Sequence, residues 1–191
     1  EEGGERMASE QVREVVVRRH VFTSERPFAS VLDGIFGGIS QPDIEALFSK
    51  LAARTSYEQF TSLVRQAEGS IGLMRFLQLD CDLVLTLDPQ EPDWDERRLV
   101  RLIVGNPVTM GQMTRHVADA GSYAPVTILI QQIPDGGTRV AYDTVASAIA
   151  PYHDAAASEV ARQLDTEVLD LLRQVTGVPS SVTPDPPGSS P

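Results

Sequence analysis

The sequence predicts an α/β domain, with a mixed β-sheet and helices packed on one face of that sheet in a two-layer sandwich. Three observations support this. Short β-branched, apolar runs alternate along the chain with segments whose apolar residues recur at helical spacing. The motif PDGG at 134–137 predicts a late hairpin. The chain has 191 residues, 41% of them hydrophobic, which is enough for one core.

The first part of the chain predicts a strand and then extra N-terminal helices. The segment Glu14–Phe22 is rich in valine and fits a strand. Ser24 can cap a helix that Pro27 enters near its first turn and that Gly37-Gly38 ends.

Two further helices are expected before the second strand. Ser40 is the expected cap of one, with Pro42 and Asp43 early in it, and Ser56 with Gln59 forms a capping box for the other.

The second part predicts more strands, a central helix and a long final helix that Asp154 caps and Gly177 ends. The segment Ile71–Leu87 is either one long bent strand or two strands joined near Asp80. The later expected elements are strand 99–104, helix 107–118, strand 124–133, strand 138–142 and the helix after Asp154. These elements predict one domain over residues 12–177, a disordered N-terminus at 1–11 and a disordered Pro/Ser-rich tail at 178–191.

Composition excludes several classes of protein. A formal net charge of −11 disfavours binding to nucleic acid or to anionic membranes. No apolar run approaches the roughly 20 residues of a membrane span, and the acidic N-terminus is not a signal peptide, so we expect a cytoplasmic protein. Cys81 is the only cysteine, which excludes an internal disulfide. Because one sheet face is left without helices, we expect a homodimer that forms through that face or through a sheet edge.

Several segments resemble a known family. The runs RFLQLDCDLVL, RLIVGNPVTMGQM and DAGSYAPVTILI, followed by the late hairpin with AYD, are similar to the bacterial and archaeal family named domain of unknown function 302. The resemblance covers roughly residues 70–176. It implies a compact α/β domain that associates in pairs, and it implies no particular activity. The chain departs from the family pattern in the helical segment 41–67 and in Val104-Gly105, where the family pattern favours Ala-Cys, which argues against a thiol-based role there.

The strand-to-helix corner Gly105-Asn106-Pro107 is the first candidate site. Glycine allows a tight exit from the strand, asparagine caps the helix, and proline suits its first turn. The start of this helix can offer backbone donors to a carboxylate, phosphate or oxyanion. The structural alternative is a well-formed helix cap without a ligand.

Helical phasing separates two sets of side chains after this corner. At about 100° per residue, Met110, Met113 and Val117 share a stripe that should face the core, with Thr109, Gln112 and His116 on its flank. His116 beside two methionines could be an axial haem ligand, a ligand of a soft metal or a general base. The structural alternative is that the methionines only pack in the core and that His116 makes a hydrogen bond at the surface.

The following loop and the region before the final helix add polar candidates. Ser122 and Tyr123 end the loop that leaves the central helix, and Tyr123 could line a pocket at the start of a strand. His153 precedes the final helix. The three histidines have no metal-ligand spacing, so no metal site is expected unless His116 binds haem.

These residues lead to three functional hypotheses. The leading one is a small-ligand-binding protein whose site lies near the corner. Its expected ligand-binding residues are Asn106, Thr109, Gln112, Ser122 and Tyr123. The first alternative is an enzyme of specialised metabolism with His116 or His153 as acid/base and Tyr123 as proton donor. The second is a haem-binding protein with His116 as axial ligand. The absence of Walker A, GxGxxG, GxSxG and HExxH motifs disfavours the common hydrolase and dinucleotide classes.

Overall fold

The computed structural model describes residues 8–53, 56–88, 90, 94, 97–134 and 136–179, and it confirms the α/β class. Five strands form one sheet in the order β1-β5-β4-β3-β2. Their bounds are β1 Arg19–Ser24, β2 Met74–Asp80, β3 Leu99–Gly105, β4 Val126–Gln132 and β5 Thr138–Asp143. The expected disordered segments 1–11 and 178–191 lie largely outside the described residues.

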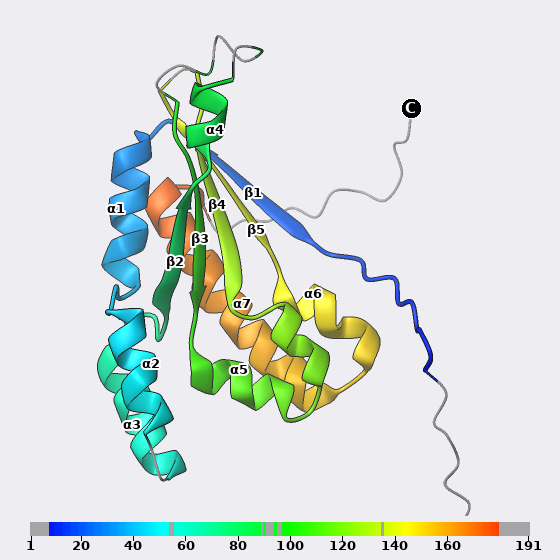
Figure 1. The fold of residues 1–191 in the computed structure, drawn as a ribbon. Coiled ribbons are helices and arrows are strands. Elements are labelled where there is room, and N and C mark those ends of the chain that lie inside the picture. The colour runs from blue at the N-terminus through cyan, green and yellow to red at the C-terminus, as the bar shows by residue number, and fades with distance from the viewer. Residues whose placement is uncertain are drawn as a thin grey trace, which may run out of the picture.

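Helices α1 and α7 pack along one face of the sheet, and the shorter helices gather at its ends (Figure 1). The extra N-terminal helices α2 and α3 lie together beyond one end of β2. The helical bounds are α1 Phe28–Gly38, α2 Ile44–Ala52, α3 Tyr57–Ala67, α4 Asp82–Thr86, α5 Pro107–Thr114, η2 Ala118–Ser122, α6 Val145–Ile149, η3 Ala150–Tyr152 and α7 Ala155–Thr176.

All described strand pairs are antiparallel, whereas the alternation of strands and helices along the sequence suggests a mixed sheet. The connection between β3 and β4 shows why. It leaves the sheet after Gly105 and returns at Val126, and Val104 pairs with Val126. Because the intervening helices start and finish at the same end of the sheet, β4 has to run back along β3.

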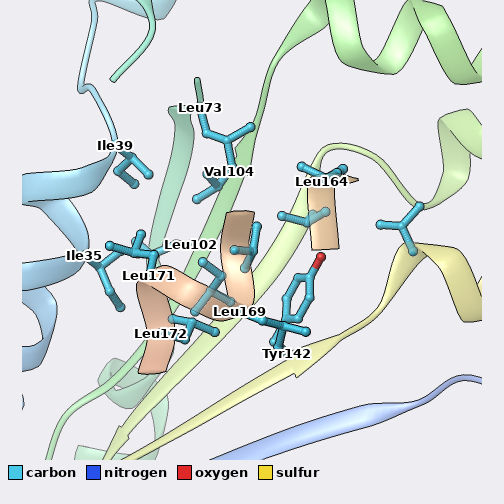
Figure 2. Packing of buried hydrophobic residues seen from close by; sticks show 14 of the residues in the cluster. Ile35, Ile39, Leu73, Leu102, Val104, Tyr142, Leu164, Leu169, Leu171 and Leu172 are labelled. Carbon is cyan, nitrogen blue, oxygen red and sulfur yellow. The ribbon is translucent and has the colours of Figure 1, made fainter. Parts of the chain in front are cut away.

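The core lies between the covered sheet face and the two long helices. Figure 2 shows Leu102 and Val104 of β3 facing Leu171 and Leu172 of α7, with Ile35 of α1 alongside. All five side chains are buried. A smaller cluster joins α2 and α3 to the start of β2 through Leu47, Leu51, Val64 and Met74.

The end of β2 and the start of β1 differ from the sequence predictions. In both cases the pairing with a neighbouring strand explains the difference. The run that ends at Leu87 is not strand throughout, because β2 stops at Asp80 and residues 82–86 form α4. Asp80 pairs with Val100, near the start of β3, so a longer β2 would have had no neighbouring strand to bond. The first strand starts at Arg19 rather than Glu14, because its pairing with β5 begins there.

Two expected helix caps are also replaced. Pro27 stands at the cap position of α1, and the Ser24 hydroxyl instead donates to the Thr176 carbonyl at 2.6 Å. Asp43, not Ser40, caps α2 by accepting from the Ala46 amide. Ser56, Asp154 and Gly177 take the capping roles that the sequence predicts.

The sheet face opposite α1 and α7 is open to solvent over the described part of the chain. Val21, Leu77 and Leu79 lie on it and are 49%, 48% and 40% exposed. Residues 8–18 form no helix or strand and run away from the end of β1 (Figure 1). Within the described ranges, no helix is long and apolar enough to cross a membrane.

Candidate functional site

The Asn106 corner is held by its own side chain. The Asn106 Oδ1 accepts from the Val108 and Thr109 amides at 2.8 and 3.4 Å, which caps α5. Its Nδ2 donates to the Glu68 carboxylate and to the Gly72 carbonyl, both at 2.8 Å. The Asn106 amide group therefore ties α5 to the segment between α3 and β2, and it occupies the backbone donors at the helix start.

Close packing at Gly105 shapes the other side of the corner. A Cβ at this position would lie 2.9 Å from Pro125 Cβ and 3.3 Å from Phe76 Cε2. A larger residue would displace one of these neighbours. The absence of a side chain at Gly105 thus lets β4 and the Phe76 ring approach the end of β3.

A cavity of about 310 Å³ lies beside this corner. It collects residues from α2, β2, the end of β3, α5, α7 and the start of β4. Several of these elements are far apart in the sequence. Its lining consists of Phe48, Phe76, Gly105, Asn106, Pro107, Thr109, Met110, Ala124, Pro125, Val126 and Leu164. Most of these residues present apolar atoms, so the cavity is an apolar site with polar groups only at Asn106 and Thr109.

Two aromatic rings stand at the α2 side of the cavity. Phe48 and Phe76 meet edge to face, with ring centroids 5.9 Å apart and planes at 79°. Phe48 is 45% exposed, so it forms part of the rim. Aromatic rims of this kind supply apolar contact area to a ligand with little loss of side-chain freedom.

The structure brings together some of the sequence-predicted ligand residues and separates others. Asn106 and Thr109 line the cavity. Gln112 is exposed on α5. Ser122 and Tyr123 instead line a second pocket, of about 180 Å³, which shares Pro125 and Val126 with the first cavity.

Neither catalytic histidine candidate lines the cavity. His116 is exposed, with its Nδ1 4.0 Å from Asp154 Oδ2. His153 is exposed at the end of η3, in the left-handed backbone region with φ 54°. The imidazoles of these residues are surface groups in this fold.

The methionines expected beside His116 divide between core and cavity. Met113 is fully buried, whereas Met110 lines the cavity. A haem held by His116 would therefore not lie in the cavity that Met110 lines. No group of three or more His, Cys, Asp or Glu side chains in the described ranges is arranged to hold a metal ion.

Tyr123 belongs to a polar cluster near the second pocket. The Tyr152 hydroxyl donates to Asp119 at 2.8 Å, and the Arg13 guanidinium lies 4.2 Å from the Tyr152 ring centroid. Hydrogen bonds to Asp119 and Tyr123, together with burial, raise the pKa of Tyr152 to about 12. The cluster links the N-terminal segment to η2 and η3.

A buried carboxylate on α7 is absent from the sequence predictions. Asp165 is 5% exposed and accepts from the Tyr142 hydroxyl at 2.7 Å and from the Val145 and Ala146 amides at 2.9 Å. Burial raises the pKa of Asp165, and burial with the nearby carboxylate raises that of Tyr142. Asp165 binds the start of α6 from another helix. Its acidic side chain beside the apolar stripe of α7 was the available signal.

The aromatic and aliphatic walls of the cavity are also absent from the sequence predictions. Phe48 and Leu164 belong to the apolar stripes of separate helices, and Phe76 belongs to a strand. No local pattern indicates that these three side chains converge on one corner.

The fold and cavity define a two-layer α/β protein with an apolar site at a strand-helix corner. The family model for the domain of unknown function DUF302 matches residues 49–175, and the chain belongs to this family. The match begins before Ser70 and includes α3, so the resemblance extends further toward the N-terminus than the motifs alone indicate.

A solved structure supports the same fold. It is the crystal structure of an uncharacterized conserved DUF302 protein from Bacillus stearothermophilus, with a TM-score of 0.52 and 14% sequence identity. The similarity covers 82% of this chain and 97% of that chain. A comparison with curated proteins finds no significant match.

Proposed function

We propose that this protein binds a small, largely apolar molecule in the cavity beside Asn106. The observation that carries the proposal is an apolar cavity of about 310 Å³ that forms where residues of three helices and three strands meet. Small-molecule sites typically measure about 300–1,000 Å³ and have mostly hydrophobic walls with a few polar groups. The cavity lies at the lower end of that range.

The chemistry of the walls favours an uncharged ligand. The Asn106 side chain already makes its bonds within the protein, and no charged side chain lines the cavity. An ionised ligand would lose its hydration without gaining a partner. The Thr109 hydroxyl is the other polar side-chain group of the lining, and it can orient a ligand.

Binding is favoured over catalysis because His116 and His153 lie outside this cavity. The alternatives of an acid/base enzyme and of a haem protein with His116 as axial ligand remain predictions. Unchanged turnover of a candidate substrate in His116→Ala and His153→Ala would count against the first. A colourless protein that takes up no added haemin would count against the second.

The binding test uses the full chain and a neutral fluorescent probe, N-phenyl-1-naphthylamine. Ala124 lines the cavity and Ala118 is exposed on η2, so Ala124→Met fills the cavity and Ala118→Met is its matched control. Burying three extra heavy atoms in the binding space should weaken probe binding at least about tenfold. Ala118→Met should leave it unchanged.

A second variant keeps the test independent of how well Ala124→Met folds. Phe48→Ala removes a partly exposed aromatic ring from the rim of the cavity. It should therefore also lower the affinity for the probe. Equal probe affinity in the wild-type protein and in both folded cavity variants would show that the cavity is not the binding site.

We also propose that the protein forms homodimers through the free edge of β1 and the segment at residues 8–18 that precedes it, which would become strand on pairing. Strand β1 pairs only with β5 in the described sheet, and an unpaired edge is a template for another strand. The preceding residues 8–18 contain four valines, and Val12 and Val16 are 82% and 84% exposed. An antiparallel pairing centred on Val16 would set Glu14 of one copy opposite Arg18 of the other.

The homodimer is tested by the mass of the full chain in solution. Val16→Pro removes an edge amide donor and should shift a dimer toward monomer, whereas Val16→Thr keeps strand propensity and should not. A monomeric wild-type protein at micromolar concentration would contradict the proposal.

A further inference from the structure

The open sheet face carries a groove whose chemistry differs from that of the corner cavity. The groove has a volume of about 280 Å³. Its residues are Arg19, Arg101, Thr127, Leu129, Arg139, Ala141 and Asp143. It shares no lining residue with the corner cavity. Three arginines thus gather on one small surface of a chain whose formal net charge is −11.

Strand register explains the arrangement. Leu129 stands between Ala141 of β5 and Arg101 of β3, so these three residues form one row across the open face. Arg139 is in the neighbouring row, beside Gln131. Ala141 is the smallest side chain of its row, and it forms a low apolar floor between longer neighbours.

The three arginines are not equivalent in charge. Arg19 makes a two-pronged ion pair with Asp143, with N–O distances of 2.7 and 2.8 Å, which neutralises both groups. Arg101 donates to the Thr127 hydroxyl at 3.3 Å. Within the described ranges, neither Arg101 nor Arg139 has a carboxylate at ion-pair distance. Two guanidinium groups therefore remain for an external anion.

An apolar strip continues from the groove across β3 and β2. Ile103 pairs with Thr127 on one side and Leu77 on the other, and Leu79 pairs with Arg101. Leu77 and Leu79 are strongly exposed for leucines. A molecule with its charged end between Arg101 and Arg139 can lay an apolar chain along this strip.

We propose that the groove binds a small amphipathic anion, an organic acid with a carboxylate at one end and an apolar body. Guanidinium groups bind carboxylates with short, charge-assisted hydrogen bonds, and the floor and strip accept the apolar part. Face-to-face packing of two copies is disfavoured, because it would bring the uncompensated arginines of both faces together.

The test measures binding of decanoate to the full chain by calorimetry, below the concentration at which decanoate forms micelles. Arg101→Gln combined with Arg139→Gln should weaken binding at least about tenfold, since charge-assisted bonds are lost. Arg115→Gln combined with Arg162→Gln makes the same change in net charge at exposed positions elsewhere, and should leave affinity within about twofold.

A ligand series separates the two parts of the proposal. Affinity should rise from acetate to hexanoate to decanoate, and decyltrimethylammonium should bind at least about tenfold more weakly than decanoate. Equal binding of the cationic and anionic chains overturns the proposal, as does equal affinity of decanoate for the wild-type protein and the Arg101/Arg139 variant.

The Ala124→Met variant distinguishes the groove from the corner cavity. Decanoate affinity should be unchanged by this substitution, because Ala124 does not line the groove. If Ala124→Met abolishes decanoate binding and the Arg101/Arg139 variant retains it, decanoate binds in the corner cavity. That result would overturn the proposal that it binds in the groove. Conversely, failure of N-phenyl-1-naphthylamine to bind would contradict the proposed cavity site without affecting the test of decanoate in the groove.

Discussion

Asn106 shows how one side chain can determine the geometry of a site without contacting a ligand through its amide. Its oxygen caps α5, and its nitrogen donates to Glu68 and Gly72. The sequence indicates the capping role, because Asn before Pro at a strand exit is a helix-start signal. The bonds to Glu68 and Gly72 were not predictable, since these residues lie 38 and 34 positions away.

The first prediction concerns the donor half of Asn106. Asn106→Asp keeps the cap but turns the group facing Glu68 and the Gly72 carbonyl into an acceptor. We expect a loss of about 1–3 kcal/mol in the free energy of unfolding at neutral pH, measured by urea denaturation. Glu68→Gln should recover part of this loss in the Asn106→Asp background, because a glutamine amide can donate to the new carboxylate. If the changes in unfolding free energy of the two single variants simply add in the double variant, the expected contact between residues 106 and 68 is contradicted.

The second prediction concerns His20, which lies partly buried on β1. Burial, followed by repulsion from Arg173 and Arg18, lowers the pKa of His20, and Asp165 opposes this shift. The neutral imidazole is therefore favoured in the folded state. Its contribution to stability is complete above the unfolded pKa of about 6.5 and is lost as pH falls through that value toward the lower folded pKa.

The measurement compares unfolding free energies at pH 7.5 and pH 5 in wild-type protein and in His20→Gln. The wild-type protein should lose more stability than the variant on acidification, by less than about 1 kcal/mol because solvent screens a partly exposed group. His153→Asn, at an exposed histidine with positive φ, is the control. Identical pH profiles of wild-type protein and His20→Gln would contradict the assignment.

At the level of elements, α1 and α7 pack closely because two glycines of α1 face α7. A Cβ at Gly34 would lie 2.8 Å from Val175 Cγ1, and one at Gly38 would lie 2.6 Å from Leu171 Cδ1. Gly37, between them, is exposed, and a Cβ added there would have no neighbouring atom within 4 Å. The sequence identifies Gly37-Gly38 as a helix end, but not Gly38 as a helix contact.

The third prediction follows from this difference within one helix. Gly38→Ala should destabilise the protein by about 1–3 kcal/mol, because the added methyl overlaps a buried leucine. Gly37→Ala should be neutral or stabilising by up to about 1 kcal/mol, because alanine favours helix and meets open space. Thermal unfolding of both variants provides the measurement, and a destabilised Gly37→Ala with an unaffected Gly38→Ala would contradict this packing of α1 on α7.

At the level of the whole molecule, the corner cavity and the open-face groove are separate sites on one sheet. They share no lining residue, and the cavity walls are apolar whereas the groove has three arginines. Sites without shared partners are expected to act additively.

The fourth prediction is that ligands of the two sites stabilise the protein independently. Each ligand at 100 times its dissociation constant should add about 2.7 kcal/mol to the free energy of unfolding. N-phenyl-1-naphthylamine and decanoate together should therefore give the sum of their separate effects in denaturant unfolding. A combined effect no larger than either alone would show that both compete for one site.

Local sequence was sufficient to predict the α/β class, the strand-helix corner at Asn106, the caps at Ser56, Asp154 and Gly177, and the membership in the family. These features depend on local periodicity, on capping chemistry and on short motifs, all of which act over a few residues. The corner at residues 105–107 and Thr109 therefore belong to the candidate site that the sequence predicts.

Which side chains meet could be learned only from the folded chain. Folding places Phe48, Phe76 and Leu164 around the corner and leaves His116 and His153 on the surface. It also makes the sheet antiparallel, ends β2 at Asp80 and brings Arg101 and Arg139 to one groove on the open face. The physical reason is that strand register and helix packing join residues distant in the chain, and their energies depend on the complete set of neighbours rather than on local pattern.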